Sequence, residues 1–260
     1  MSAAPPFRSF VVNLDGSEGR LAAFATQMAA QDLPWARVAA VDGRRLTPAE
    51  AARVDDAACR RYMGRSLQPG EIGCCLSHLR ALERFLATDA DVACLFEDDA
   101  ALAPGFRATA EAAAAAVLGG DAPRVVNLGP SRTKYHREVA ALPGGAALHQ
   151  AFYFPMLATG VLWSRPAAAA FLRDCAAVTL PHDNRLRVWL TGTPHGFAVL
   201  PGVVAQSQAF GSDIERANLG AKRGALRRSP FYFLFKQRRL WGEKLRAMRA
   251  MRRAGPVGRA

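Results

Sequence analysis

A short apolar run, Val92 to Phe96, ends abruptly at three consecutive acids, Glu97, Asp98 and Asp99. Four to eight apolar residues in a row are typical of a buried strand in a parallel sheet. Open α/β sheets bind ligands at the carboxyl ends of such strands, which is where the acids stand. In extended chain Glu97 and Asp99 would share one face. Their oxygens suit Mg²⁺ or Mn²⁺; the alternative is a solvated acidic turn.

The order of elements along the chain favours an α/β fold built on one mostly parallel sheet. A strand at 9–14, a helix at 18–31 and a strand at 35–41 form the β-α-β opening, and a helix at 71–87 leads into the acidic strand. Residues 130–150 are polar and are predicted to be irregular. Later we expect helices at 104–118 and 166–176, strands at 124–128 and 197–201, and a loop at 180–184.

The positive charge of the chain is concentrated at its end. From Lys222 onward there are 13 Lys or Arg and one acid, whereas residues 1–221 hold 21 of each sign. We therefore divide the chain into a domain at 1–215 and a basic tail at 216–260. The neutral body argues against a nucleic-acid-binding domain. A nucleic-acid-binding protein that acts through the tail, with strongly salt-dependent binding, stays the alternative.

The tail has the pattern of an amphipathic helix. Its apolar residues fall near one helical stripe: Leu234, Trp241, Leu245, Met248 and Met251. A basic amphipathic helix with a Trp fits an interfacial membrane helix, so an anionic membrane surface is the predicted partner. A helix packed on the domain with a solvated basic face, or a disordered basic tail, would share this composition.

The remaining composition indicates the compartment. Five cysteines show no Cys-x-x-Cys spacing, and no apolar stretch has the length of a signal peptide or a membrane span. We expect a cytoplasmic protein, held peripherally at the inner face of the cytoplasmic membrane.

Two blocks carry a family resemblance. Leu67-x-Pro69-Gly70-Glu71-Ile72-Gly73-Cys74-Cys75-Leu76-Ser77-His78, followed by Leu95 to Ala100, resembles glycosyltransferase family 25, the bacterial lipopolysaccharide and lipooligosaccharide galactosyltransferases. Further segments resemble the family in order: 11–14 with Arg20, 38–43, 158–164, 181–183, 204–206 and 212–214. The resemblance spans about residues 9–215.

The resemblance implies a GT-A-type domain, a UDP-sugar donor, most simply UDP-galactose, and a divalent cation, Mn²⁺ or Mg²⁺. The acceptor would be a saccharide or glycolipid of the envelope, and no specific nucleic acid is expected. A relative that binds UDP-sugar without transferring it stays an alternative.

The site residues follow from the same blocks. The expected metal ligands are Asp99, Glu97 and Asp213. The expected donor-binding residues are Arg20, Asp42, His78, Glu97, Asp98 and Gln206. An inverting transfer needs a base for the acceptor hydroxyl, and Asp183 is the candidate, against a role as a helix N-cap. The alternatives without a functional role are a surface ion pair for Arg20, an ordinary turn for Asp42 and a structural histidine for His78.

Overall fold

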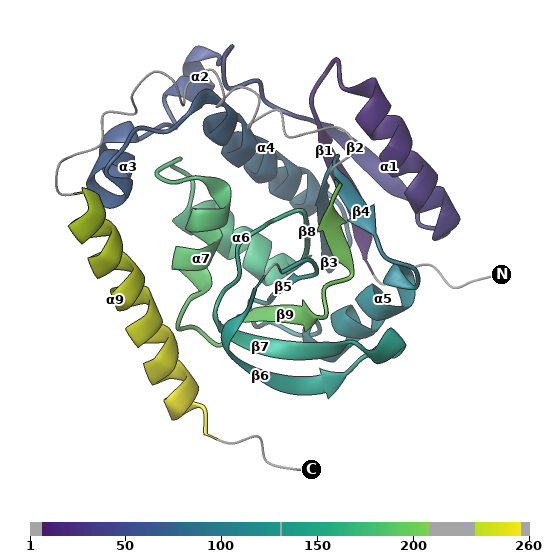
Figure 1. The fold of residues 1–260 in the computed structure, drawn as a ribbon. Coiled ribbons are helices and arrows are strands. Elements are labelled where there is room, and N and C mark those ends of the chain that lie inside the picture. Colours follow the sequence, from purple (N-terminus) through teal and green to yellow (C-terminus); the bar gives the residue numbers. More distant parts are fainter. Residues whose placement is uncertain (1–6, 131, 208–231, 256–260) are drawn as a thin grey trace.

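The computed structural model describes residues 7–130, 132–207 and 232–255, which form an α/β domain flanked by one long helix (Figure 1). The first half contains β1 (Arg8–Asn13), α1 (Glu18–Ala30), β2 (Trp35–Ala39), α2 (Pro48–Ala51), α3 (Asp56–Met63), α4 (Pro69–Leu86), β3 (Val92–Glu97), β4 (Ala100–Leu102), α5 (Phe106–Val117) and β5 (Val125–Asn127). The second half contains β6 (Lys134–Ala141), the 3-10 turn η1 (Pro143–Gly145), β7 (Ala147–Tyr153), β8 (Gly160–Ser164), α6 (Arg165–Asp174), α7 (His182–Leu190), β9 (Gly196–Leu200), β10 (Val204–Gln206) and α9 (Tyr232–Arg253).

The central sheet has eight strands in the order β2-β1-β3-β8-β5-β9-β7-β6. Three neighbouring pairs are parallel (β1–β2, β1–β3 and β5–β9). Four pairs are antiparallel (β3–β8, β5–β8, β7–β9 and β6–β7). The prediction of an α/β fold is confirmed, but the prediction of a mostly parallel sheet is wrong, because β8 and β7 run against the other six strands.

The error comes from residues 130–150, which form most of a β-hairpin rather than an irregular stretch. Strand β6 lies at the edge of the sheet and none of its residues is fully buried. An edge strand without a buried face lacks the alternation of apolar and polar residues by which strands are recognised. The hairpin and the reversed β8 supply the four antiparallel pairs of the central sheet.

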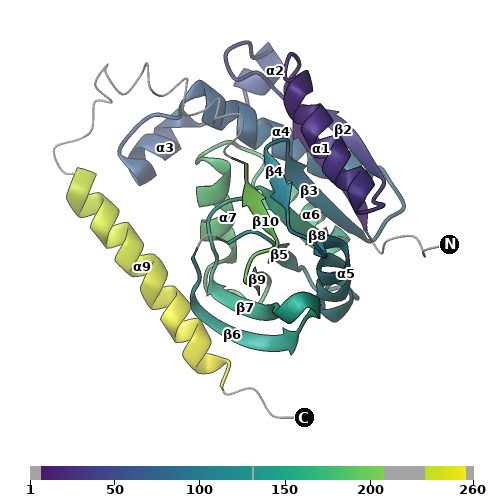
Figure 2. The ribbon, with the colours of Figure 1, turned by 45° about the vertical axis from the view of Figure 1, so that its right-hand side comes forward.

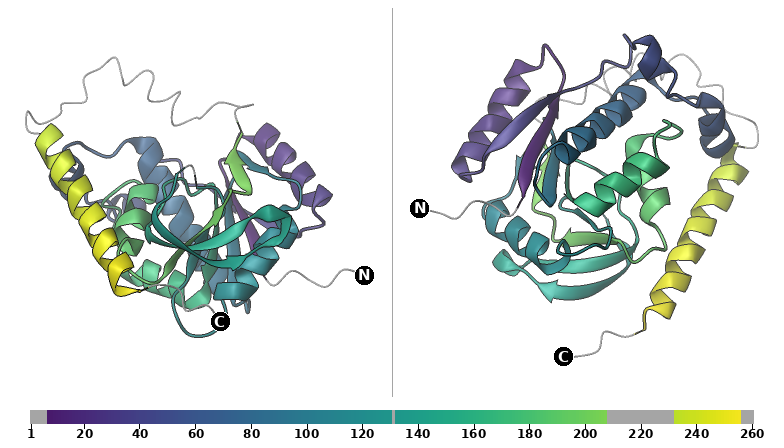
Figure 3. Two further views of the ribbon diagram at one scale, coloured as in Figure 1. Left: turned by 60° about the horizontal axis from the view of Figure 1, so that its bottom comes forward. Right: turned by 180° about the vertical axis from the view of Figure 1, so that it is seen from behind.

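Two apolar clusters cover the two faces of the sheet. Because side chains alternate along a strand, Phe10 and Val12 of β1 pack into one cluster with α3, α4, α6 and α7, and Val11 packs into the other with α1 and α5. Figure 2 shows α1 in front of β2 and β1, and Figure 3 shows the opposite face from behind. The result is a three-layer arrangement whose strand ends are open at one edge.

Helix α9 packs along the side of the domain through a narrow contact (Figure 3). Glu243 is buried and accepts hydrogen bonds from Tyr62 Oη at 2.6 Å and Tyr153 Oη at 3.4 Å. Ala247, one turn further on, is also fully buried against Tyr153. The docking face of α9 is therefore centred on Glu243 and Ala247.

The opposite face of α9 is turned to solvent. At about 100° per residue, Leu234, Trp241 and Leu245 lie roughly opposite Glu243, and their exposed fractions are 66%, 59% and 43%. The predicted apolar stripe thus does not form the contact with the domain. No helix within the described ranges is both long and apolar enough to span a membrane.

Candidate active site

A cavity of about 520 Å³ opens at the carboxyl ends of β1, β2 and β3. The chain passes from β1 to β2 through α1 on one face of the sheet and returns to β3, on the other side of β1, through α4 on the opposite face. Open α/β sheets bind ligands at such switch points. The volume is within the range of roughly 300–1,000 Å³ found for small-molecule sites. Seven of the predicted site residues line the cavity: Arg20, Asp42, His78, Glu97, Asp98, Asp99 and Gln206.

The first half of α4 forms one wall of the cavity, through contacts between main chains. A side chain on Gly43 would meet Pro69 O at 1.8 Å, and one on Gly73 would meet Val41 O at 2.5 Å. Ser77 Oγ accepts a hydrogen bond from Val41 N at 2.8 Å and donates one to Gly73 O at 2.6 Å. The glycines and the serine of the block at 67–78 therefore hold the loop after β2 against α4.

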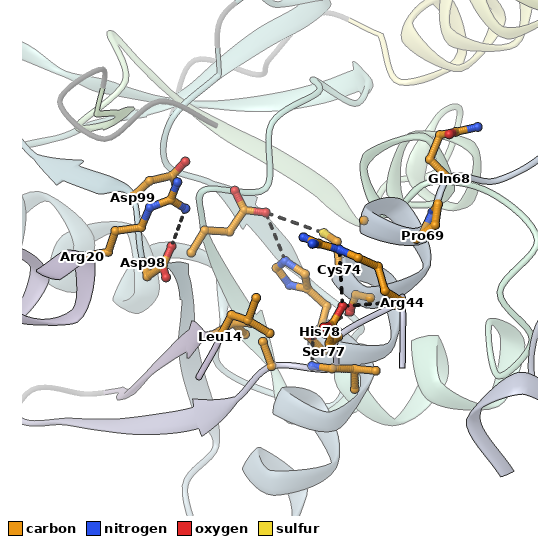
Figure 4. Close-up of a pocket in the computed structure, with 18 of the residues that line it drawn as sticks. Leu14, Arg20, Arg44, Gln68, Pro69, Cys74, Ser77, His78, Asp98 and Asp99 are labelled. Atoms are coloured by element: carbon orange, nitrogen blue, oxygen red, sulfur yellow. Dashed lines mark hydrogen bonds and ion pairs between the residues drawn. The ribbon is translucent and has the colours of Figure 1, made fainter. Parts of the chain in front are cut away.

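The three acids after β3 do not follow the alternation expected of an extended chain. Strand β3 ends at Glu97, and Asp98 and Asp99 form a turn before β4. The expectation that Glu97 and Asp99 share one strand face is therefore wrong, since the turn brings all three carboxylates to the cavity. Figure 4 shows Arg20, Asp98 and Asp99 on one side of the cavity and Cys74 and His78 on the other.

Asp98 is tied to the body of the domain. It accepts a hydrogen bond from Asn13 Nδ2 at 2.7 Å and pairs with Arg20 Nη1 at 3.4 Å. Burial raises the pKa of Asp98, whereas the bonds from Asn13 and Arg20 oppose the rise. The predicted Arg20 is an ion-pair partner, and its side chain is largely buried at the cavity rather than on the outer surface.

Asp99 is held from across the small β4–β10 ribbon, which is antiparallel and pairs Gln206 with Ala100. Gln206 Nε2 donates to Asp99 Oδ2 at 2.8 Å, while Asp99 Oδ1 is buried and has no hydrogen-bond partner within the described ranges. Burial and then the negative charge of Glu97 raise the pKa of Asp99 to about 6. A buried carboxylate oxygen without a partner, beside a second carboxylate, fits a hard divalent cation.

Glu97 faces helix α4. Its Oε1 lies 3.4 Å from His78 Nε2 and 3.8 Å from Cys74 Sγ. The ring of His78 stacks on His182, with centroids 3.9 Å apart. Burial holds the pKa of His182 well below its ordinary value, with His78 adding to the effect. The stacking places the start of α7 directly behind this cluster.

Asp183 lies next to this stack and is not among the residues that line the cavity. Helix α7 begins at His182, so residues 182–184, predicted as loop, are helical. The N-cap of α7 is Pro181, and Asp183 Oδ2 instead accepts a hydrogen bond from Leu157 N at 3.2 Å. Burial and the charge of Glu97 raise the pKa of Asp183 to about 6. The helix N-cap alternative is therefore wrong for Asp183.

Asp42 and Asp213 differ from the other predicted site residues. Asp42 lines the cavity and also orders its own turn, because its Oδ1 accepts a hydrogen bond from Arg44 N at 3.0 Å. Asp213 lies outside the described residues. The sequence interpretation assigned no role to Asn13, Arg44, Cys74, Ser77 or His182; of these, Asn13 could have been found by its position at the end of the first strand.

Comparison with known proteins gives the class. Residues 7–141, more than half of the chain, match glycosyltransferase family 25 (LPS biosynthesis protein). The chain belongs to this family and is a glycosyltransferase, as the resemblance predicted. A search among curated proteins finds no match.

Proposed function

We propose that this glycosyltransferase moves a sugar, galactose in the simplest case, from a UDP-sugar to a saccharide acceptor of lipopolysaccharide or a related envelope glycan. The observation that carries the proposal is the cavity at the ends of β1, β2 and β3, where Glu97, Asp98 and Asp99 meet within the family-matched region. A cavity of this size suits a nucleotide sugar. We place the donor here.

The charges of the cavity support a divalent cation. Among the residues that the structure describes, Arg20 pairs with Asp98 and Arg44 with Asp42, and neither Glu97 nor Asp99 forms an ion pair with a guanidinium. A diphosphate would be repelled by these two carboxylates unless a cation lay between them. Glu97 and Asp99, whose Oδ1 has no hydrogen-bond partner among the described residues, would hold the cation. Bound there, Mn²⁺ or Mg²⁺ would stabilise the charge that develops on the departing UDP.

The remaining cavity residues suit the organic part of the donor. Arg20 and Arg44 supply positive charge at opposite sides of the cavity (Figure 4). Asp42 and the main chain at Gly43 stand at the end of β2, where a nucleoside hydroxyl or base edge could bond. Asn13 fixes Asp98 and with it the guanidinium of Arg20. We assign Arg20 to donor phosphate and Asp42 to the nucleoside.

We assign Asp183 as the base that takes the acceptor hydroxyl proton in an inverting transfer. A carboxylate whose pKa is about 6 is deprotonated at neutral pH and is a stronger base than an ordinary one. The carboxylate of Asp183 interacts electrostatically with Glu97 and His78, which both line the cavity, so it lies near the reacting region. Moving the proton to Asp183 Oδ would leave the acceptor oxygen free to attack the sugar.

We further propose that α9 holds the enzyme on an anionic membrane at the cytoplasmic face. Its outward stripe carries Leu234, Trp241 and Leu245, and the same side of the helix bears Arg238 and Arg252. Apolar side chains flanked by arginines fit the boundary between acyl chains and anionic headgroups. A lipid-borne acceptor would then be met at the surface where it resides.

The experiment is a panel of UDP-sugars incubated with the full chain and Mn²⁺, scored by released UDP, by thermal shift and by mass of the glycosylated acceptor. Turnover with UDP-galactose and with no other UDP-sugar of the panel would support the proposal. If a UDP-sugar shifts the melting temperature but no sugar is transferred to any acceptor tried, the protein would be a relative that binds the donor without transferring it. Salt-dependent DNA or RNA binding without any UDP-sugar effect would favour the tail-mediated alternative.

A further inference from the structure

One wall of the cavity carries a thiol and an imidazole, which are ligands that a hard cation such as Mg²⁺ does not use. Cys74 and His78 stand four residues apart on α4, so both side chains lie on the same face of the helix, and Glu97 approaches from the end of β3. Their donor atoms, Cys74 Sγ, a His78 ring nitrogen and a Glu97 carboxylate oxygen, all lie within 4.8 Å of one another. Figure 4 shows Cys74 and His78 side by side on the wall of the cavity.

We propose that Cys74, His78 and Glu97 form a site for Zn²⁺ with its fourth position open to the cavity. Thiolate, imidazole and carboxylate are the ligands that zinc takes in proteins, whereas Mg²⁺ and Mn²⁺ prefer oxygen alone. Three protein ligands and one open position are typical of zinc sites that face a substrate cavity. The site is distinct from Asp99, which contributes no atom to it.

Two of the three separations match the edges of a zinc tetrahedron. With zinc–nitrogen and zinc–oxygen bonds of about 2.0–2.1 Å and a zinc–sulfur bond of about 2.3 Å, tetrahedral angles put oxygen about 3.4 Å from nitrogen and about 3.6 Å from sulfur. The structure has 3.4 Å from Glu97 Oε1 to His78 Nε2 and 3.8 Å from Glu97 Oε1 to Cys74 Sγ. The third edge, from Cys74 Sγ to the His78 ring nitrogen, is at most 4.8 Å in the structure and would be about 3.6 Å in the tetrahedron, so these two side chains have to approach each other when zinc binds.

The surroundings keep the ligands in place and reachable. Stacking on His182 fixes the plane of the His78 ring. All three ligands line the cavity, so an ion can enter from solvent. Cys74 is half-buried, whereas the other four cysteines are buried. On binding, the Cys74 thiol releases its proton to solvent, since protein-bound zinc holds the thiolate.

A zinc ion bound at this site would also affect the donor side of the cavity. Glu97 is shared between the zinc site and the acids that face the donor phosphates. Zinc held by Cys74 and His78 would keep Glu97 turned toward α4. The site would thus set whether Glu97 is free for the hard cation.

The test is metal binding by the full chain without any nucleotide sugar, so its outcome is separate from the proposed function. The metal-free protein is titrated with Co²⁺ and then with Zn²⁺ in competition. We expect one equivalent of Co²⁺ with a thiolate-to-cobalt charge-transfer band that Zn²⁺ abolishes. Cys74→Ser should lose this band and weaken Zn²⁺ binding at least 10-fold.

The matched control is Cys75→Ser on the same helix. Cys75 Sγ donates to Leu180 O at 3.1 Å, away from the cavity, and a serine hydroxyl can keep that bond. Cys75→Ser should therefore bind both metals as the unaltered chain does. Absence of the charge-transfer band in the unaltered chain, or its persistence in a folded Cys74→Ser protein, would overturn the proposal.

Discussion

Gln206 donates a hydrogen bond of 2.8 Å to Asp99, although 107 residues separate the two in the chain. The contact depends on the pairing of β4 with β10, which brings Gln206 from the second half of the domain next to the acids that follow β3. It satisfies one oxygen of Asp99 and leaves the other buried without a partner within the described ranges.

Asp99→Asn should lower kcat/KM of cation-dependent sugar transfer by roughly 100-fold or more, because a neutral amide cannot hold a divalent cation beside Glu97. The fold should persist, since the amide oxygen can still accept the bond from Gln206. UDP release and circular dichroism measure the two effects. Asp89→Asn, at a side chain 94% exposed, is the matched control and should behave as the unaltered enzyme does. Equal turnover in both variants would remove Asp99 from the cation site.

Arg20→Gln should raise the KM for the UDP-sugar about 10-fold and change kcat less, because the guanidinium is assigned to binding rather than to the chemical step. The substitution also removes the cation beside Asp98, which keeps its hydrogen bond from Asn13. Adding Asp98→Asn should restore part of the lost stability, since the buried charge is then gone. Initial rates across donor concentrations and urea midpoints check both statements. A loss confined to kcat would contradict the binding role.

Asp183 should give the pH profile its acidic limb. Its folded pKa of about 6 exceeds the ordinary 3.8, so kcat should fall below about pH 6 as the base becomes protonated. In the same window the folded state binds more protons than the unfolded state. The free energy of unfolding should therefore decrease from about pH 4 to pH 6, by on the order of 2 kcal/mol.

Asp183→Asn tests both parts. It should abolish transfer while leaving UDP-sugar binding, and it should reduce the dependence of the free energy of unfolding on pH between 4 and 6, leaving the part that the raised pKa of Asp99 contributes. Undiminished transfer by the Asp183→Asn protein would assign the base to another group.

Gly73→Ala should destabilise the domain by roughly 2 kcal/mol or more, because the new methyl group would meet main-chain atoms that cannot rotate away. Donor binding should weaken with it, since the wall of the cavity must shift. Gly242→Ala is the control, because nothing lies within 4 Å of the new methyl group and α9 gains helix propensity. Urea unfolding should therefore show opposite signs for the two variants.

The double substitution Trp241→Ser and Leu245→Ser should weaken binding to anionic vesicles by about 10-fold or more, with little change in melting temperature. Both side chains are exposed, so replacing them should remove the proposed membrane contact without removing core packing. Vesicle flotation at two salt concentrations measures it. Val139→Ser, at another exposed apolar residue, is the control. Undiminished flotation would show that the outward stripe of α9 does not bind lipid.

The sequence predicted the parts of the fold and site that depend on local patterns. The apolar runs of β1 and β3 and the acids that follow β3 are recognisable without any partner, and they lie where they were expected. Strand β6 was missed because an edge strand has no buried face to produce alternation. The start of α7 was missed because Leu180, Pro181 and His182 have the composition of a loop, whereas Pro181 is the N-cap.

The rest depends on how helices dock on the sheet. The angle at which α4 crosses β3 decides that Cys74 and His78 both meet Glu97, and no spacing in the chain encodes that angle. The stack of His78 on His182 likewise joins two segments 104 residues apart, through the packing of α7 on α4. Burial raises the pKa of Asp99 and of Asp183, and it too becomes visible only once the layers are assembled.

The contact of Gly43 with Gly73 limits how this enzyme can acquire a new donor. Where two main chains touch, exchanging one side chain for another cannot widen or reshape the wall. Any change of nucleotide or sugar preference has to arise on the facing side, around Arg20 and Asp98, or from the ribbon that carries Gln206. Libraries that seek altered specificity should therefore leave 41–43 and 69–77 untouched and diversify the opposite side.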